Sequence, residues 1–289
     1  MQPTVLCHAL LVMAIITSIN AYPHHAKAQQ ERPPGQIVID PQQVFDQFVG
    51  QHAEADQEEL ERVQIPLADE RAYGKQAFEQ FAASLRNKGV RMTRKGPEVR
   101  RLQKLIQKIK PNMKNANRYR NITVYVADSQ ATDARSFPGG TLVIFRGMIE
   151  FAESEGALVG VLGHELSHLD HGHQLRHVRL MKMAESSFQR GGQQPDWREM
   201  MANGMFLARS MARPFRAEDE TQADADGATW AFRAGYEPLD MARLFQRMAE
   251  RDGNAGTMIP EFLRSHPYHE NRFQAIVQLS EQLKEEKED

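Results

Sequence analysis

The sequence predicts an α+β fold that is predominantly helical, with a small β-sheet packed against one buried helix. Three observations support this. Apolar residues recur three and four positions apart in several long segments, which is typical of helices. Two short segments rich in β-branched and aromatic residues, 121–127 and 136–145, lie near the middle of the chain. They are followed by residues 156–170, a largely apolar segment in helical register.

The N-terminal residues 1–28 are predicted to be a secretory signal. An apolar run from Val5 to Ile19 suits the core of a signal and is short for a membrane span. Ala26-Lys27-Ala28 offers a cleavage site, and the protein is then expected to be exported, periplasmic or extracellular, and soluble. Lys and Arg are absent before the apolar run, so an uncleaved anchor is the alternative. We expect a linker and helix over 29–65 and the main domain over 66–289.

Composition excludes several classes of function. The 289 residues carry a formal charge of −2, with basic residues interleaved with acids, so no nucleic-acid partner is expected. Cys7 is the only cysteine and lies inside the predicted signal. Cysteine chemistry is therefore excluded for catalysis, metal binding and disulfides in the mature chain.

Helices are predicted before the sheet. Residues 41–64 are expected to form an N-terminal helix. A stronger helix is expected from Pro66 to near Gly89, and another over 97–111, where five apolar residues follow helical spacing. These five are Val99, Leu102, Leu105, Ile106 and Ile109.

The sheet is predicted from residues 121–127 and from a second strand that ends at Phe145 and is entered through Pro138-Gly139-Gly140. Gly147 then leads into the next helix. A strand directly before such a helix is expected to form a sheet edge that can pair with an extended peptide. An ordinary structural hairpin is the alternative.

The pattern His164-Glu165-Leu166-Ser167-His168 lies in the apolar segment. Two histidines four apart project from one face of a helix, which suits two ligands of one Zn²⁺. Glu165 is placed beside them to take a proton from a metal-bound water. A solvated polar helix face is the alternative, but unpaired His and Glu in an apolar helix would be costly.

Helical character is predicted to continue from His168 to about Gln189, with a loop at Gly191-Gly192. A methionine-rich helix follows and is interpreted as core filling, or alternatively as a lid over the site. Its apolar residues include Met200, Met201, Met205, Phe206 and Met211.

A catalytic zinc takes three protein ligands and one water, so a third ligand is needed. His171 and His173 follow the motif closely, and we interpret them as neighbours of the ligands or surface residues. Glu220 and Asp224 share one face of a later predicted helix that carries small residues, so they can approach the motif helix. A solvated acidic face is the alternative.

The motif and Glu220-Thr-Gln-Ala-Asp224-Ala-Asp-Gly227 together resemble the CAAX-prenyl-protease superfamily of zinc metalloendopeptidases, in its soluble, exported BepA- and HtpX-like branch. Phe137-Pro-Gly-Gly140, Gly235-Tyr-Glu-Pro238 and Ser265-His-Pro267 with Arg272 extend the resemblance over roughly residues 66–280. It implies a gluzincin-type metallopeptidase domain that binds one Zn²⁺ through His164, His168 and Glu220.

The resemblance also implies roles for other residues. Glu165 would be the general base, Asp224 a proton donor or a support for a ligand, and His266 either an oxyanion stabiliser or a resting-state cap on the metal. Protein or peptide substrates are implied, namely unfolded or misassembled cell-envelope proteins, with peripheral membrane or outer-membrane assembly partners. A chaperone-like or binding module with a self-capped, inactive metal site is the alternative function.

The chain departs from the family pattern in two places. Arg216 lies four residues before Glu220, where the family usually has an arginine three before, so its orienting role is not implied. No helical-repeat domain follows residue 280, so the partner specificity of such a domain is not implied either.

Overall fold

The computed structural model describes residues 57–189, 215–255, 266 and 270–288. All of them belong to one compact unit, Ile39–Asp289. The predicted signal (1–28), the linker that follows it, the loop at 191–192 and the methionine-rich helix lie outside the described residues. Within the described ranges, no helix is both long enough and apolar enough to cross a membrane.

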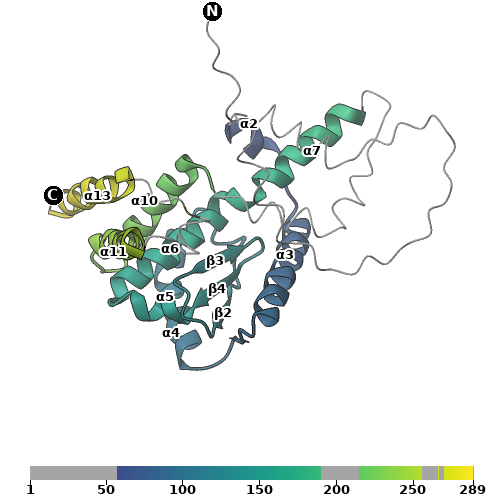
Figure 1. The fold of residues 1–289 in the computed structure, drawn as a ribbon. Coiled ribbons are helices and arrows are strands. Elements are labelled where there is room, and N and C mark those ends of the chain that lie inside the picture. Colours follow the sequence, from purple (N-terminus) through teal and green to yellow (C-terminus); the bar gives the residue numbers. More distant parts are fainter. Residues whose placement is uncertain (1–56, 190–214, 256–265, 267–269, 289) are drawn as a thin grey trace, which may run out of the picture. The chain divides into compact units, whose positions relative to one another are not determined.

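The fold class is confirmed, because helices surround one four-stranded sheet (Figure 1). The strands are β1 (Met92–Thr93), β2 (Thr123–Ala127), β3 (Ala134–Phe137) and β4 (Thr141–Phe145), in the order β1-β2-β4-β3. β2 and β4 are parallel, whereas β1 and β3 pair antiparallel with their neighbours.

Helices cover both faces of this sheet. Val124, Val126 and Ile144 pack into the core shared with α4 (Pro97–Ile109) and α6 (Glu155–His171). Val143 and Phe145 point the other way and pack with α3 (Leu67–Asn87). Side chains alternate between the two faces because successive residues of a strand point to opposite sides. All five apolar positions predicted for 97–111 are buried in α4.

Of the two alternatives for the strand before the motif helix, the sheet edge is wrong and the ordinary hairpin is confirmed. β4, which precedes the motif helix, lies between β2 and β3, and β3 forms the edge. β3 and β4 make an antiparallel hairpin around Pro138-Gly139-Gly140, closed by the N–H of Gly140 donating to Phe137 O at 3.1 Å. Gly139 and Gly140 both have positive φ, which glycine adopts at little cost. The two glycines therefore form the turn between β3 and β4, and do not simply precede a single strand.

The motif helix α6 is a separate, well-capped element. A short helix, α5 (Arg146–Phe151), precedes it, and the Ser154 side chain accepts a hydrogen bond from the N–H of Ala157 to start α6. Gly172, with φ of 66°, ends it in the left-handed conformation. Helical structure does continue to Gln189 as predicted, but Gly172 interrupts it. A 3₁₀ turn (His173–Leu175) and then α7 (Arg176–Gln189) follow.

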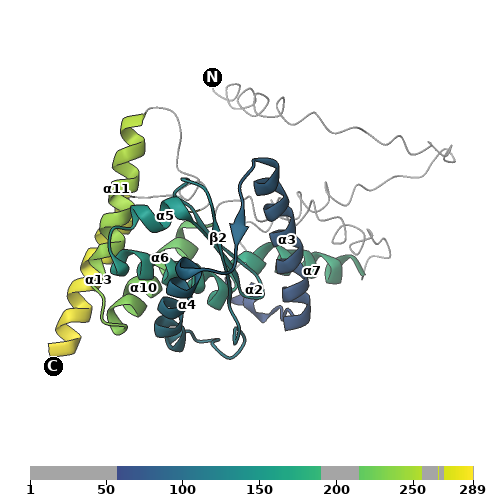
Figure 2. The same cartoon turned by 90° about the horizontal axis from the view of Figure 1, so that it is seen from below.

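The C-terminal helices pack on α6. α10 (Ala217–Arg233) crosses α6 closely, and α11 (Leu239–Ala255) and α13 (Glu270–Glu288) pack against this pair. Figures 1 and 2 both place α11 and α13 on the far side of α6 from α3. The remaining described helix, α2, spans Gln57–Arg62. Residues far apart in the sequence thus meet around α6.

Candidate metal centre

The centre begins with three motif residues on α6. His164 and His168 lie one turn apart and project from one face, and Glu165 follows His164 directly. All three are at most 1% exposed. Fifteen of the seventeen residues of α6 are buried, so this helix runs through the protein interior. Its polar motif is enclosed by protein on every side.

Glu220 reaches the motif because α10 approaches α6 at a glycine contact. A Cβ atom placed on Gly163 would lie 2.9 Å from the Cα of Gly227, and one placed on Gly227 would lie 2.7 Å from Gly160 O. Only glycine allows two helices to cross at this separation. The contact holds the first turns of α10, with Glu220, against the two histidines.

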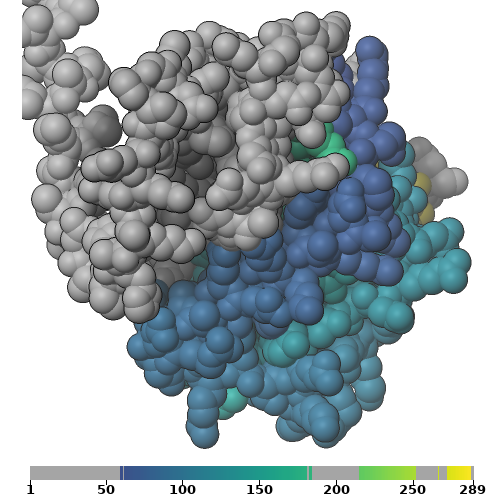
Figure 3. Space-filling view, turned by 90° about the vertical axis from the view of Figure 1, so that its right-hand side faces the viewer, coloured from purple at the N-terminus to yellow at the C-terminus, as the bar shows by residue number. Residues whose placement is uncertain are grey.

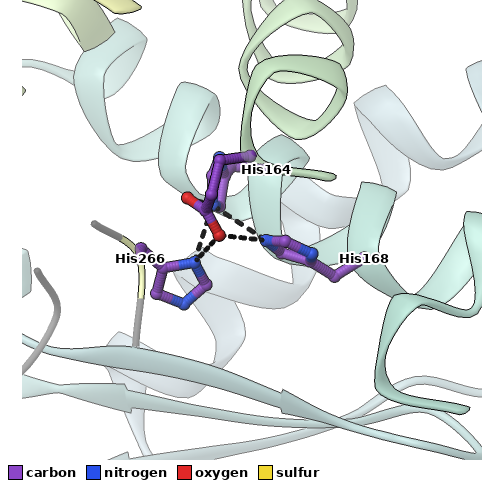
Figure 4. Close-up of side chains that lie close together, drawn as sticks. His164, His168 and His266 are labelled. Atoms are coloured by element: carbon purple, nitrogen blue, oxygen red, sulfur yellow. Dashed lines mark hydrogen bonds and ion pairs between the residues drawn. The ribbon is translucent and has the colours of Figure 1, made fainter. Parts of the chain in front are cut away.

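Four side chains direct donor atoms to one point (Figure 4). The Nε2 atom of His164 lies 3.1 Å from Nε2 of His168 and 3.0 Å from Nδ1 of His266. Glu220 Oε1 lies 2.9 Å from the His266 nitrogen and 3.4 Å from the His168 nitrogen. Four ligands held tetrahedrally at about 2.0–2.1 Å from Zn²⁺ would be roughly 3.3 Å apart. The donor set therefore fits a metal ion.

Unsatisfied polar atoms support the same conclusion. Neither oxygen of Glu165 has a hydrogen-bond partner, although His266 Nε2 lies 3.3 Å from Oε1. Glu220 Oε2 also lacks a hydrogen bond, although Arg272 forms an ion pair with it at 2.9 Å. Buried carboxylate oxygens are costly without partners. Their position at the donor cluster is what a metal ion and the water beside it would explain.

Hydrogen bonds behind the histidines fix their ring orientation. Nδ1 of His164 lies 3.0 Å from Asp224 Oδ1, and Nδ1 of His168 lies 2.9 Å from Nδ1 of His173. His173 in turn contacts Gln222 through Nε2 at 3.2 Å. If each ligand histidine carries its proton on Nδ1, both Nε2 atoms keep a lone pair for a metal. This is the arrangement expected behind metal-binding histidines.

Arg272 ties several of these groups together. Its Nε and Nη2 atoms donate to the two oxygens of Asp224 at 2.5 and 2.7 Å, and Nη1 donates to the backbone oxygen of His266 at 3.3 Å. The same Nη1 pairs with Glu220. Because His164 and Arg272 occupy both oxygens of Asp224, this carboxylate supports the donors and does not face the point where they meet.

The six site residues predicted from the sequence thus lie together: His164, Glu165, His168, Glu220, Asp224 and His266. His171 does not join them, because its Nε2 lies 2.9 Å from Asp226. Arg216 pairs with Asp219 and not with Glu220. His173 contacts His168, as the first of the two interpretations given for it expects, although the sequence did not show which ligand it would contact. Gly172 was the available signal, because a helix-ending glycine turns the next residue back.

Sequence reasoning missed Phe215. Its ring stacks on His168 with centroids 3.9 Å apart and planes tilted by 19°, and it lies 5.2 Å from the His266 ring. A single phenylalanine before the acidic helix carries no sequence signal for such a position. Phe215 shields one face of the donor cluster.

The charges of the buried groups depend on one another. Burial lowers the pKa of His168 to about 4, so this ring is neutral near pH 7. Burial would also lower the pKa of His266, but Glu220 and Glu165 raise it to about 9. Burial would raise the pKa of Glu165 and of Glu220. The positive charge of His266 is the main reason why the pKa of each carboxyl instead lies below its usual value. Without a metal, His266 is a cation between two carboxylates, so metal binding at this nitrogen releases a proton.

An HExxH helix with a buried His/Glu donor cluster, in an α+β fold, defines a metallopeptidase. The comparisons agree with this class. Residues 98–280 match the model of peptidase family M48, and the chain belongs to this family.

Named relatives in the same family are distant. The chain is 26% identical over 160 residues to the mitochondrial metalloendopeptidase OMA1 of Schizosaccharomyces pombe. That match covers 53% of this chain and 45% of that protein. It is also 23% identical over 188 residues to the beta-barrel assembly-enhancing protease of Yersinia pestis. That match covers 59% of this chain and 37% of that protein. The matched part spans less than half the length of each of these two relatives.

Proposed function

We propose that this chain is a zinc-dependent metalloendopeptidase that hydrolyses peptide bonds of unfolded or misassembled cell-envelope proteins. One observation carries the proposal: a buried His164, His168 and Glu220 donor set lies beside Glu165, whose oxygens form no hydrogen bond. The experiment is cleavage of a denatured protein by the zinc-loaded chain. We expect cleavage that a chelator abolishes and added zinc restores.

The donor chemistry favours zinc. Two or three imidazole nitrogens and one carboxylate suit Zn²⁺, whereas Mg²⁺ and Ca²⁺ prefer sites made of oxygen ligands. The described residues place no thiolate at the cluster, in keeping with the single Cys7 of the sequence. We assign one zinc ion per chain to His164, His168 and Glu220.

The residues of the site divide the work of hydrolysis. Zinc, when bound, would acidify a water and polarise the substrate carbonyl. Glu165 takes the proton of the attacking water on its carboxylate and delivers it to the leaving nitrogen. Enclosure by α6 and Phe215 limits competing water and strengthens the electrostatic interactions inside the site.

The edge strand β3 is the proposed seat of the substrate. Its outer edge has no neighbouring strand in the described sheet, and Ser136 of this strand accepts a hydrogen bond from Gln174, which follows α6. An extended peptide that adds to such an edge gains main-chain hydrogen bonds without a requirement for sequence. Unfolded protein supplies extended segments of this kind.

The cellular setting rests on the sequence and on one relative. The predicted signal at 1–28 supports export, with residues 29–65 as an N-terminal extension and 66–289 as the peptidase domain. The name of the Yersinia pestis relative, a beta-barrel assembly-enhancing protease, supports substrates or partners linked to the assembly of β-barrel proteins. Exported protein that begins at Gln29 would support this setting, and a retained N-terminus would favour a membrane anchor.

His266 supports a capped resting state, which is the second candidate function. Its Nδ1 atom lies among the donors, at the position that a catalytic zinc leaves to water. A permanently capped ion would make the chain a metal-containing binding module and not a peptidase. We favour a cap that opens, because the motif glutamate Glu165 lies beside it, with Oε1 3.3 Å from His266 Nε2 and no hydrogen bond to either oxygen.

His266→Ala is expected to raise the rate of peptide cleavage several-fold, because it frees the fourth metal position. Rates on a denatured protein, with zinc content and thermal unfolding measured in parallel, check this. A lower rate at full zinc content would show that His266 takes part in turnover and is not a cap.

Asp224→Asn is expected to weaken zinc binding by about 10–100-fold, as losses behind metal-binding histidines do. The amide cannot both accept from His164 and pair with Arg272 as the carboxylate does. Competition with a chromophoric chelator measures the affinity. Asp226→Asn is the matched control, since Asp226 contacts Ser167 and His171 instead. Equal affinities in both variants would refute the role given to Asp224.

A further inference from the structure

A hollow lies away from the metal centre, on the α3 side of the sheet. It measures about 280 Å³ and is lined by α3, the turn before β4, and side chains of β2 and β4. Figure 3 looks onto the side of the molecule that carries α3, whose atoms are purple to blue. The sheet separates α3 from α6, so this hollow is distinct from the donor cluster.

Positive charge dominates the lining. Arg71, Lys75 and Arg94 line the hollow with a single acid, Glu79, which pairs with Lys75 at 3.9 Å. The side chains of Arg71 and Arg94 have no hydrogen-bond or ion-pair partner among the described residues. Other arginines near the sheet do have one: Arg91, for example, pairs with Asp128 at 3.2 Å. Two unpaired guanidinium groups thus border one concave space.

The rest of the lining offers hydroxyl groups and an aromatic wall. Thr123, Thr141 and Tyr125 are half-buried there. The rings of Phe78 and Tyr125 contact each other with centroids 4.7 Å apart. Hydroxyl groups can donate to an anion that arginines attract, and the rings can cover the organic part of a ligand.

The rim of the hollow is held in place before any ligand binds. A Cβ atom on Gly74 of α3 would overlap Pro138 O at 1.6 Å, so the helix lies directly on the turn. Glu70 accepts a hydrogen bond from the N–H of Gly139 at 2.9 Å and is itself held by Arg118 and Tyr119. The backbone that carries Arg71 and Lys75 is therefore fixed relative to Thr141.

We propose that this hollow binds a phosphate group carried by a small organic ligand. Arginine forks match phosphate oxygens in pairs, and the size suits a phosphate with a short substituent. A soluble phosphomonoester and the headgroup of an anionic phospholipid share this chemistry. Phosphate binding here does not depend on peptidase activity.

The test uses the full chain and two probes, glycerol 3-phosphate in solution and phosphatidylglycerol vesicles. Calorimetry measures the first, and flotation against phosphatidylcholine vesicles measures the second. The variant is Arg71→Gln with Arg94→Gln. Its control is Arg86→Gln with Arg100→Gln, which removes the same charge from exposed positions outside the hollow. Thermal unfolding confirms that both fold.

We expect the wild type and the control to bind one of the probes, and the Arg71/Arg94 variant to bind it at least tenfold more weakly. Loss of glycerol 3-phosphate binding identifies a soluble ligand, and loss of flotation identifies a headgroup. The proposal is overturned if neither probe binds, if the variant binds like the wild type, or if the control loses as much. If the phosphate bound at the metal centre instead, the Arg71/Arg94 variant would bind it like the wild type.

Discussion

Glu165→Gln is expected to abolish peptide cleavage while the metal stays bound. The amide keeps the size of the side chain but cannot accept a proton, and loss of a general base lowers rates by about 10²–10⁴-fold. Glu165 is not one of the four clustered donors, so metal affinity is expected to change little. Cleavage of a denatured protein and metal content, measured on the same preparation, check both parts.

Glu150→Gln serves as the control, because Glu150 is exposed on the neighbouring helix α5. It removes the same charge without touching the centre and should cleave at the wild-type rate. Cleavage by Glu165→Gln at the wild-type rate would show that another group takes the proton of the attacking water.

Gly227→Ala is expected to lower both stability and metal binding. The added methyl group would lie 2.7 Å from Gly160 O and 3.0 Å from the backbone nitrogen of His164. These are backbone atoms, so the helices must move apart, which typically costs about 1–3 kcal/mol of unfolding free energy. The movement carries Glu220 away from the histidines. Denaturant unfolding and zinc affinity measure the two effects.

Ala217→Ser is the matched control, since it adds one atom at an exposed position of the same helix α10. It should leave both quantities near the wild-type values. Unchanged zinc affinity in Gly227→Ala would mean that the close crossing of α6 and α10 is not what places Glu220.

Local patterns predicted the elements that have strong periodicity. The five apolar residues of α4 are buried as expected, and the spacing of His164 and His168 placed both rings on one face. β3 was missed as a separate strand because four residues, Ala134–Phe137, are too few to show alternation. With β3 unseen, β4 was taken for the edge.

Sequence spacing did not predict the contacts between residues that lie far apart in the chain. Arg272 lies 48 residues from Asp224, and no local pattern shows that its guanidinium reaches that carboxylate. Spacing made Glu220 a candidate ligand, but composition alone favoured a solvated acidic helix, so the assignment of Glu220 as a ligand rested on the resemblance. His266 entered the prediction through the resemblance alone. Gly172 was overlooked because apolar residues continue on both sides of it, which hid the helix end that brings His173 back to His168.

Zinc K-edge X-ray absorption on the purified chain, combined with metal analysis, tests the central claim most directly. The account predicts one zinc per chain with three imidazole nitrogens and one carboxylate oxygen in the resting protein. His266→Ala should then lose one nitrogen signal and keep the metal. A chain that binds no zinc, and that cleaves protein equally well with a chelator present, would contradict the account.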